Sequence, residues 1–184
     1  KKVLIMVAHR PDRSPSQRFR YEQYLPFLEK NGFEFDYSYL ISEEDDKFFY
    51  RPGFYLKKAL FLLKAFRIRF NDLKRVKKYD LVFIQREAFL LGTTYFERKI
   101  AATGIPIIYD FDDAIWESNK EGGNKALSFL KNPGKTSELI ELSTSVIAGN
   151  KYLADFTKKY NDNVSIIPTT IDMSYHQLSK LNDE

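Results

Sequence analysis

Short apolar runs and longer amphipathic segments alternate along the whole sequence. Continuous apolar runs, which are typical of parallel strands buried on both faces, occur at 2–8, 80–85, 106–111, 145–149 and 164–168. Residues 33–40 alternate apolar and polar positions and form one more predicted strand. Helical spacing predicts helices at about 16–30, 54–75, 94–103, 136–143 and 151–160. This order predicts an α/β fold with a doubly wound parallel sheet between two helical layers, a three-layer αβα arrangement.

Two local signals refine this reading. The stretch SEEDD at 42–46 reads as an acidic loop, and Thr94 with Glu97 reads as a capping box for the helix that ends at Gly104. Asn150 reads as the N-cap of the helix that follows it.

Ligands of doubly wound sheets bind outside the carboxyl ends of the strands. The side chains that follow the predicted strands are therefore the candidates for a site. They are His9 to Arg20, Gln85 to Glu87, Asp110 to Trp116, Gly149 and Asn150, and Thr169 and Thr170.

The composition indicates a folded globular protein and narrows the chemistry. Hydrophobic residues make up 43% and charged residues 29% of the 184 positions, which suits one domain with a sizeable core. The sequence has no cysteine, which excludes disulfides, thiolate metal sites and cysteine nucleophiles. Of its two histidines, His9 faces the expected cleft and His176 is expected to be inert, so no metal site is predicted. No apolar run approaches the ~20 residues of a membrane-spanning helix.

Positive charge is concentrated in one segment. Residues 51–79 carry ten Lys or Arg and one acid, a net charge of +9 within an overall +4. The segment 54–78 is also rich in Leu and Phe, a pattern typical of basic amphipathic helices that lie on anionic membranes. Its expected membrane contacts are Lys57, Lys58, Lys64 and Arg67, and its expected core residues are Leu56, Leu60, Leu63 and Phe66. Nucleic acid would fit the charge but is excluded as a partner, because no recognisable nucleic-acid module accompanies it.

Three carboxylates follow the fourth predicted strand, in the stretch IIYDFDDAIW at 107–116. A D-x-D pair fits the divalent-metal site of GT-A-type glycosyltransferases, but those enzymes begin with a nucleotide-binding βαβ unit and are generally longer. It also fits the nucleophile motif of haloacid-dehalogenase-type phosphatases, although that motif normally follows the first strand. Capping and a structural ion pair are the alternative. Arg10, Arg18, Arg20 and Arg86 are expected at the same edge, which favours a polar cleft.

Several segments together resemble the N-terminal, acceptor-side domain of GT-B-fold glycosyltransferases of the family 4, or group 1, type. They are KVLIMV at 2–7, SQRFRYEQYLPFLEKNGFEF at 16–35, YDLVFIQRE at 79–87, GIPIIYDFDDAIW at 104–116 and SVIAGNKYLADFTKKYNDNVSIIPTTID at 145–172. The resemblance implies a two-domain enzyme that transfers a sugar, with retention, from a nucleotide-diphosphate sugar to an acceptor. It also implies that residues 1–184 are one Rossmann-like domain, a fragment inactive alone, because the domain that binds most of the donor is absent.

The sequence departs from the family pattern at two places. The loop after the first strand lacks the Gly-Gly turn of many members, so Ser16, Arg18 and Arg20 are expected to bind anions by their side chains. Asp112 and Asp113 stand where many members carry a His-Asp or His-Glu pair, which makes them the catalytic candidates. A carboxylate there would accept a hydrogen bond from a sugar hydroxyl or favour oxocarbenium-like charge. The other substrate-binding candidates are His9, Arg10, Arg86, Glu87 and Asn150.

The resemblance also sets the expected partners and location. It implies a glycan or lipid-linked acceptor, no catalytic metal, and no cofactor beyond the donor substrate. A cytoplasmic protein, peripheral on the inner face of the membrane, is expected. One reading from another class stays open, namely a stand-alone Rossmann-like binding module without catalysis.

Overall fold

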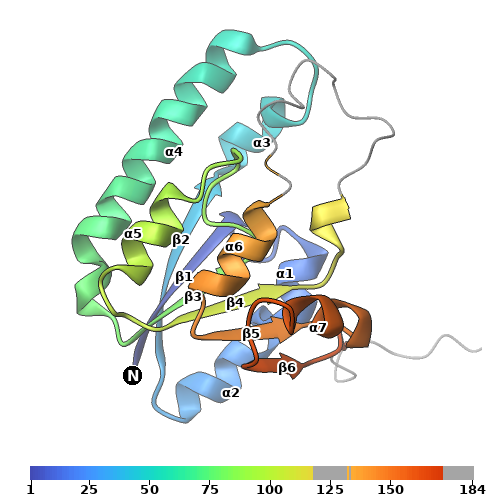
Figure 1. Cartoon of the computed structure of the whole chain (residues 1–184). Coiled ribbons are helices and arrows are strands. Elements are labelled where there is room, and N and C mark those ends of the chain that lie inside the picture. Colours follow the sequence, from blue (N-terminus) through green and yellow to red (C-terminus); the bar gives the residue numbers. More distant parts are fainter. Residues whose placement is uncertain (118–131, 133, 172–184) are drawn as a thin grey trace, which may run out of the picture.

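Figure 1 shows a computed structural model of the chain, in which residues 1–117, 132 and 134–171 are described. These residues form a six-stranded parallel sheet with the strand order β2-β1-β3-β4-β5-β6. The strands are β1 (Lys2–His9), β2 (Glu34–Ile41), β3 (Leu81–Gln85), β4 (Ile107–Phe111), β5 (Ser145–Ala148) and β6 (Val164–Ile166). The chain places β2 on one side of β1 and then crosses to the other side, where β3, β4, β5 and β6 follow in order. The predicted doubly wound parallel sheet is confirmed.

Helices cover both faces of this sheet. They are α1 (Pro15–Arg20), α2 (Leu25–Lys30), α3 (Glu43–Phe49), α4 (Tyr55–Arg75), α5 (Tyr95–Ala101), α6 (Lys135–Leu142) and α7 (Lys151–Thr157), with 3-10 turns η1 (Glu22–Tyr24), η2 (Val76–Lys78) and η3 (Ile115–Glu117). On one face, Tyr21 and Leu25 from the chain around α2 pack against β1. On the other face, Ile100, Leu139 and Leu153 of α5, α6 and α7 lie in the main core. The predicted three-layer αβα arrangement is confirmed.

The single helix predicted at 16–30 is wrong, because the structure divides it into α1, η1 and α2. Tyr21 leaves helical geometry with φ −143° and ends α1. Pro26 lies in the first turn of α2, where its missing N–H costs no hydrogen bond. The helix therefore restarts at the proline.

Capping differs from the prediction at two helices. The stretch read as an acidic loop begins α3, where Ser42 accepts from the Asp45 N–H and Asp45 accepts from the Ser42 N–H (2.9 Å). Acidic residues in the first turn also stabilise a helix, because the N-terminal end of the helix dipole is positive. At α5, Thr94 makes no side-chain cap. Glu97 instead turns inward and accepts a hydrogen bond from the Ala88 N–H (3.0 Å).

The long helix α4, which runs along one side of the molecule in Figure 1, turns a different face to the core from the one predicted. Its buried residues are Phe61, Ala65, Arg69 and Asp72, with Phe66 partly buried beside them. Leu56, Leu60 and Leu63 are 75%, 57% and 66% exposed, so their predicted core position is wrong. Hydrogen bonds from Arg69 fix this rotation, because its buried guanidinium donates to the carbonyls of Val7 (2.9 Å), Ser38 (3.1 Å) and Ala88 on other segments. No helix in the described part of the chain is long and apolar enough to span a membrane.

Candidate functional site

The carboxyl ends of the parallel strands bring side chains from distant segments together, as the sequence predicted. Three contacts link the acidic stretch at the carboxyl end of β4 to its neighbours, two of them to α1 and one to the residue that follows β3. They are Arg20 with Asp110, Ser16 with Asp112, and Arg86 with Asp113.

Asp110 is a structural member of the acidic stretch. Its carboxylate is buried and accepts hydrogen bonds from the Nε (3.3 Å) and Nη2 atoms of Arg20. Burial raises the pKa of Asp110, and the hydrogen bonds and charge of Arg20 oppose that rise. Arg20 also donates to the carbonyl of Ile167. The pair therefore ties α1 to β4 and to the end of β6, and Arg20, predicted as an anion ligand, is already occupied.

The Asp112 carboxylate is held in place by one hydrogen bond, but only one of its two oxygens has a partner within the described part of the chain. Its Oδ2 accepts a hydrogen bond from Ser16 Oγ (2.6 Å), and that hydroxyl accepts one from Gln85 Nε2 (3.1 Å). Its Oδ1 is buried and has no hydrogen-bond partner among the described residues. Behind it, a Cβ added to Gly149 would lie 3.2 Å from Asp112 Cα, so only glycine fits there without a shift. One carboxylate oxygen is thus positioned and left free to accept.

Asp113 is exposed, and its Oδ2 lies 3.3 Å from Arg86 Nη1. Arg86 has a left-handed backbone (φ 63°), and its N–H donates to the Asp110 carbonyl (2.9 Å). Its own carbonyl accepts from the Tyr109 hydroxyl (2.9 Å). A strained backbone held by two hydrogen bonds directs the Arg86 side chain outward toward Asp113.

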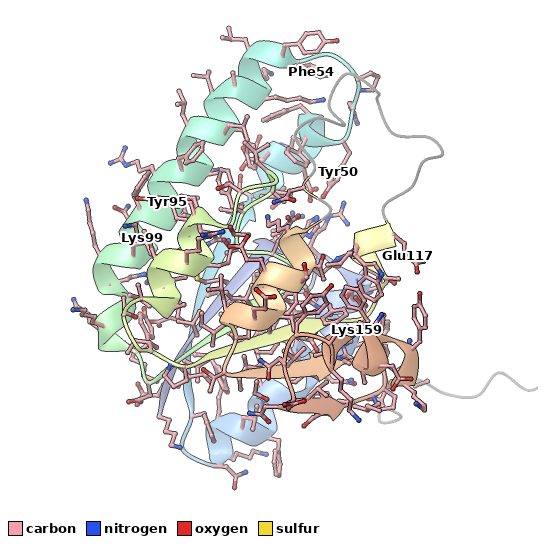
Figure 2. The ribbon with its side chains drawn as sticks, viewed as in Figure 1. Tyr50, Phe54, Tyr95, Lys99, Glu117 and Lys159 are labelled. Atoms are coloured by element: carbon pink, nitrogen blue, oxygen red, sulfur yellow. The ribbon has the colours of Figure 1, made fainter. Side chains whose placement is uncertain are left out.

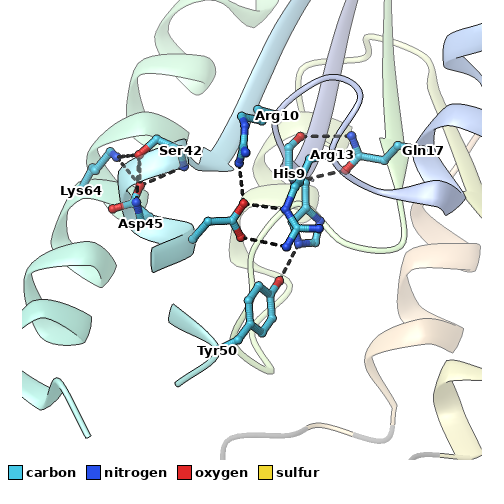
Figure 3. Close-up of polar contacts among 9 residues, drawn as sticks. His9, Arg10, Arg13, Gln17, Ser42, Asp45, Tyr50 and Lys64 are labelled. Carbon is cyan, nitrogen blue, oxygen red and sulfur yellow. Dashed lines mark hydrogen bonds and ion pairs between the residues drawn. The ribbon is translucent and has the colours of Figure 1, made fainter. Parts of the chain in front are cut away.

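A second polar group surrounds the end of β1 (Figure 3). Arg10 and Arg13 both bind Asp46 of α3, and His9 Nε2 lies 2.5 Å from the Tyr50 hydroxyl. Burial lowers the pKa of His9, the nearby arginines lower it further, and Asp46 opposes the shift. His9 is therefore a neutral, hydrogen-bonded strand-end histidine near neutral pH.

The remaining predicted site residues have local partners. Glu87 pairs with Lys135 of α6 (2.7 Å). Arg18 Nε lies 3.8 Å from Asp12 Oδ1, an ion pair without a hydrogen bond, and that Nε has no hydrogen-bond partner among the described residues. Asn150 caps α7 by accepting from the Leu153 N–H (3.0 Å), which confirms the predicted cap. His176 lies outside the described residues. In the described part of the chain, no group of three His, Asp or Glu side chains is placed to hold a metal.

The predicted membrane-contact residues lie on α4, but they are not equivalent. Lys57 and Arg67 are exposed and make no ion pair with the described residues, whereas Lys64 pairs with Asp45 (2.5 Å). Lys58 donates to the carbonyl of Arg51 (2.6 Å). Phe54, just before the helix, lies at its outer end (Figure 2).

Two polar residues of the site, Asp46 and Tyr50, escaped the sequence analysis. Gln85 and Arg13 lay within the candidate ranges but were not singled out as substrate-binding residues. Gln85 ends a predicted strand beside Arg86, so its position was a usable signal. The contact between Arg13 and Asp46 joins residues 33 positions apart and leaves no local pattern in the sequence.

Comparisons with known proteins show which known fold the chain resembles. No protein-family model and no curated protein matches the sequence. An alpha-glucosyltransferase solved with UDP and a 13-mer DNA containing a HMU base matches with a TM-score of 0.50 and 15% identity, over 94% of this chain and 43% of that one. An alpha-glucosyltransferase solved with UDP-glucose and DNA containing an abasic site matches with the same TM-score and identity, over 94% of this chain and 44% of that one.

At this identity the likeness shows the fold alone. The chain has a Rossmann-like, GT-B glycosyltransferase-like fold, and it spans less than half the length of the structures it matches. The exclusion of nucleic acid made from the sequence is wrong, since both similar structures hold DNA. Phosphate contacts need only basic side chains and backbone N–H groups, so a missing sequence module excludes nothing.

Proposed function

We propose that this chain is the acceptor-side, N-terminal domain of a retaining glycosyltransferase of the family 4, or group 1, type. The whole enzyme would move a sugar from a nucleotide-diphosphate donor to a glycan or lipid-linked acceptor. A second domain outside these 184 residues would bind most of the donor, so the chain alone is inactive. The GT-B-like fold supports this proposal, and the sequence resemblance supports the assignment to the acceptor side.

The observation that carries the proposal is the state of Asp112. A buried carboxylate oxygen without a partner is costly unless something binds it. A sugar hydroxyl at this edge of the sheet would donate a hydrogen bond to that oxygen. The negative charge would also favour the oxocarbenium-like charge that develops as the donor bond breaks. Ser16 and Gln85 orient the carboxylate, so the position needs no reorganisation during the reaction.

In this proposal, Asp113 and Arg86 contact the same substrate beside Asp112. Both side chains are exposed and pair at 3.3 Å, a distance at which either can turn to a polar substrate. Surface pairs of this kind are worth at most about 1 kcal/mol, so exchanging the partner for a substrate costs little.

A donor screen of the full-length parent polypeptide tests the proposal. We expect release of nucleoside diphosphate with one nucleotide sugar, and a fall in turnover of about 10²-fold or more for Asp112→Asn. Asp162→Asn, an exposed acid after α7, is the matched control and should keep full turnover. Glycans, lipid-linked glycans and DNA form the acceptor panel. No release with any donor from a folded parent would favour the stand-alone binding module instead.

We also propose that α4 holds the domain at an anionic membrane surface, as a peripheral cytoplasmic protein. The supporting observation is that Leu56, Leu60 and Leu63 form an exposed apolar stripe beside Lys57 and Arg67. Basic residues alone would suit any polyanion, but exposed leucines at helical spacing gain free energy only where they enter an apolar phase.

Vesicles of phosphatidylcholine with and without phosphatidylglycerol test this location. Lys74 is a further exposed basic residue of α4. Replacing Lys57, Arg67 and Lys74 with Ser should weaken binding by about 100-fold, since each basic residue contributes about 1 kcal/mol near the surface. Lys151, Lys158 and Lys159 replaced together are the control; Lys159 lies far from α4 in Figure 2. Binding of the unaltered protein to duplex DNA but not to anionic vesicles would assign the stripe to nucleic acid and refute the membrane proposal.

A further inference from the structure

Two arginines of the β1–α1 loop converge on a single carboxylate (Figure 3). Arg10 Nη1 lies 2.5 Å from Asp46 Oδ2, and Arg13 donates from Nε to Oδ2 (2.6 Å) and from Nη2 to Oδ1 (3.3 Å). The side chains of Arg10 and Arg13 are 28% and 42% exposed, whereas that of Asp46 is 12% exposed. The group therefore carries an excess positive charge that solvent can reach.

The cap of α3 depends on Asp45 and not on Asp46. Asp45 completes the capping box with Ser42 and pairs with Lys64 of α4. The Asp46 side chain instead leaves the helix toward the loop, and its backbone N–H is already bonded to the Ser42 carbonyl (3.1 Å). The carboxylate is thus free to leave the arginines without disturbing the cap.

The two guanidinium groups keep most of their donors. Together they carry about ten N–H bonds, and Asp46 takes three of them. No other hydrogen bond of these two side chains occurs within the described residues. Paired guanidinium forks with unused donors match the several oxygens and double charge of a phosphate better than one carboxylate does.

The position also suits a phosphate. The order of strands reverses between β1 and β3, and ligands of doubly wound sheets bind at that point. Arg10 directly follows β1, and Ser16, which holds Asp112, lies six residues further on, in the first turn of α1. The loop and the start of the helix that follows it therefore present the arginine pair and the support of the carboxylate.

We propose that Arg10 and Arg13 bind a phosphate or diphosphate group, and that Asp46 occupies this site as an internal counter-ion that the ligand displaces. The identity of the ligand as a glycosyltransferase substrate rests on the proposed function, but the site itself does not. A nucleoside diphosphate and a lipid phosphate share the chemistry that the two arginines recognise.

Calorimetric titration of the full-length protein with inorganic pyrophosphate tests the site. Asp46→Asn removes the competing charge and should tighten pyrophosphate binding by about 10-fold or more, equivalent to 1.4 kcal/mol. Arg13→Gln should weaken it by a similar factor, and Arg13→Lys, which keeps the charge but loses the fork, should lie between. Asp45→Asn on the same helix is the control and should leave pyrophosphate affinity unchanged.

The direction of the Asp46→Asn effect separates the two roles that this carboxylate can have. If Asp46 is a fixed structural partner of the arginines, its replacement loosens them and weakens pyrophosphate binding, which would overturn the proposal. Pyrophosphate-dependent shifts in melting temperature repeat the comparison if a variant is unstable, because a ligand stabilises only the folded state. An unchanged affinity in Arg13→Gln would overturn it equally.

Competition then identifies the source of the phosphate. Stronger displacement of pyrophosphate by a nucleoside diphosphate assigns the site to the donor, and stronger displacement by a short-chain lipid phosphate assigns it to the acceptor. Binding requires no turnover, so a parent without transferase activity can still show the predicted Asp46→Asn effect. Conversely, an active enzyme whose affinity falls in Asp46→Asn would refute this inference and leave the proposed function intact.

Discussion

Replacing Arg69 with methionine tests whether one buried side chain holds together the segments behind the candidate site. Arg69 belongs to α4 and is fully buried. It donates to the carbonyls of Val7 (2.9 Å), Ser38 (3.1 Å) and Ala88, and to Asp72 (2.9 Å). Those partners lie on β1, on β2 and just after β3, so a single guanidinium joins three segments that lead into the site.

The cost of losing this group can be worked from its contacts. A methionine side chain fills much of the volume of the arginine stem, so the cavity term is small. Three buried carbonyls would nevertheless lose their donor. At the lower bound of about 1 kcal/mol each, these three losses cost about 3 kcal/mol. A fully broken buried ion pair costs about 3–5 kcal/mol. Asp72 keeps its contact with Arg75 (2.9 Å), so its loss is closer to that of one charge-assisted hydrogen bond, about 1.5 kcal/mol. We expect Arg69→Met to lower the free energy of unfolding by about 4 kcal/mol.

Urea unfolding followed by circular dichroism measures this change. A loss of about 4 kcal/mol is a large part of the 5–15 kcal/mol that stabilises a typical domain. Arg67→Met, an exposed position two residues away on the same helix, is the control and should change stability by less than about 0.5 kcal/mol. The double variant Arg69→Met with Asp72→Asn should recover part of the loss, because the buried Asp72 charge of the single variant has only Arg75 as a charged partner. A cost below about 1 kcal/mol for Arg69→Met would refute the reasoning.

Three further outcomes follow from the structure. Gly149→Ala should force Asp112 to move, which should lower turnover in activity assays and cost about 1–3 kcal/mol in unfolding curves. Gly134→Ala, whose added Cβ has its nearest contact at 3.4 Å, is the control and should show neither effect. Asn150→Ala should cost about 1 kcal/mol in thermal unfolding, and Asn150→Ser, which keeps a capping oxygen, should cost much less. Burial alone would raise the pKa of Asp46, but hydrogen bonds from its two arginines lower it overall, so its contribution to stability is present above about pH 4 and is lost as the pH falls further. Acid unfolding curves should therefore depend less on pH in Asp46→Asn, and an unchanged slope would contradict the assigned ion pairs.

The sheet could be predicted because each of its strands has a recognisable hydrophobic pattern in the sequence. Five consecutive residues of β1 are buried, and a continuous apolar run is what burial on both faces requires. The edge of the sheet where polar side chains gather followed from the same prediction, since parallel strands end together. The gathering of Ser16, Arg86 and the acidic stretch at that edge was predicted in this way, whereas their individual contacts were not.

The orientation of α4 was not predictable from hydrophobicity. The helix carries two stripes at helical spacing, and the one with more leucines is the exposed one. The buried stripe contains Arg69 and Asp72, which hydropathy assigns to the surface. Their burial becomes favourable only when β1, β2 and the segment after β3 supply partners, and these partners are tertiary. The same holds for Arg13 and Asp46, whose pairing depends on how α3 is placed.

The three acids at the carboxyl end of β4 differ in role according to how completely each carboxylate is hydrogen-bonded. Asp110 is buried and fully paired with Arg20, so it cannot accept a substrate hydroxyl without breaking the contact that fixes α1. Asp113 is exposed, and water competes there for any hydrogen bond that a substrate offers. Asp112 alone among the three combines a fixed orientation with a buried oxygen that lacks a partner within the described residues. Because an interaction gains most where water is excluded and the acceptor is already in position, the proposed sugar transfer should depend on Asp112 more than on either neighbour.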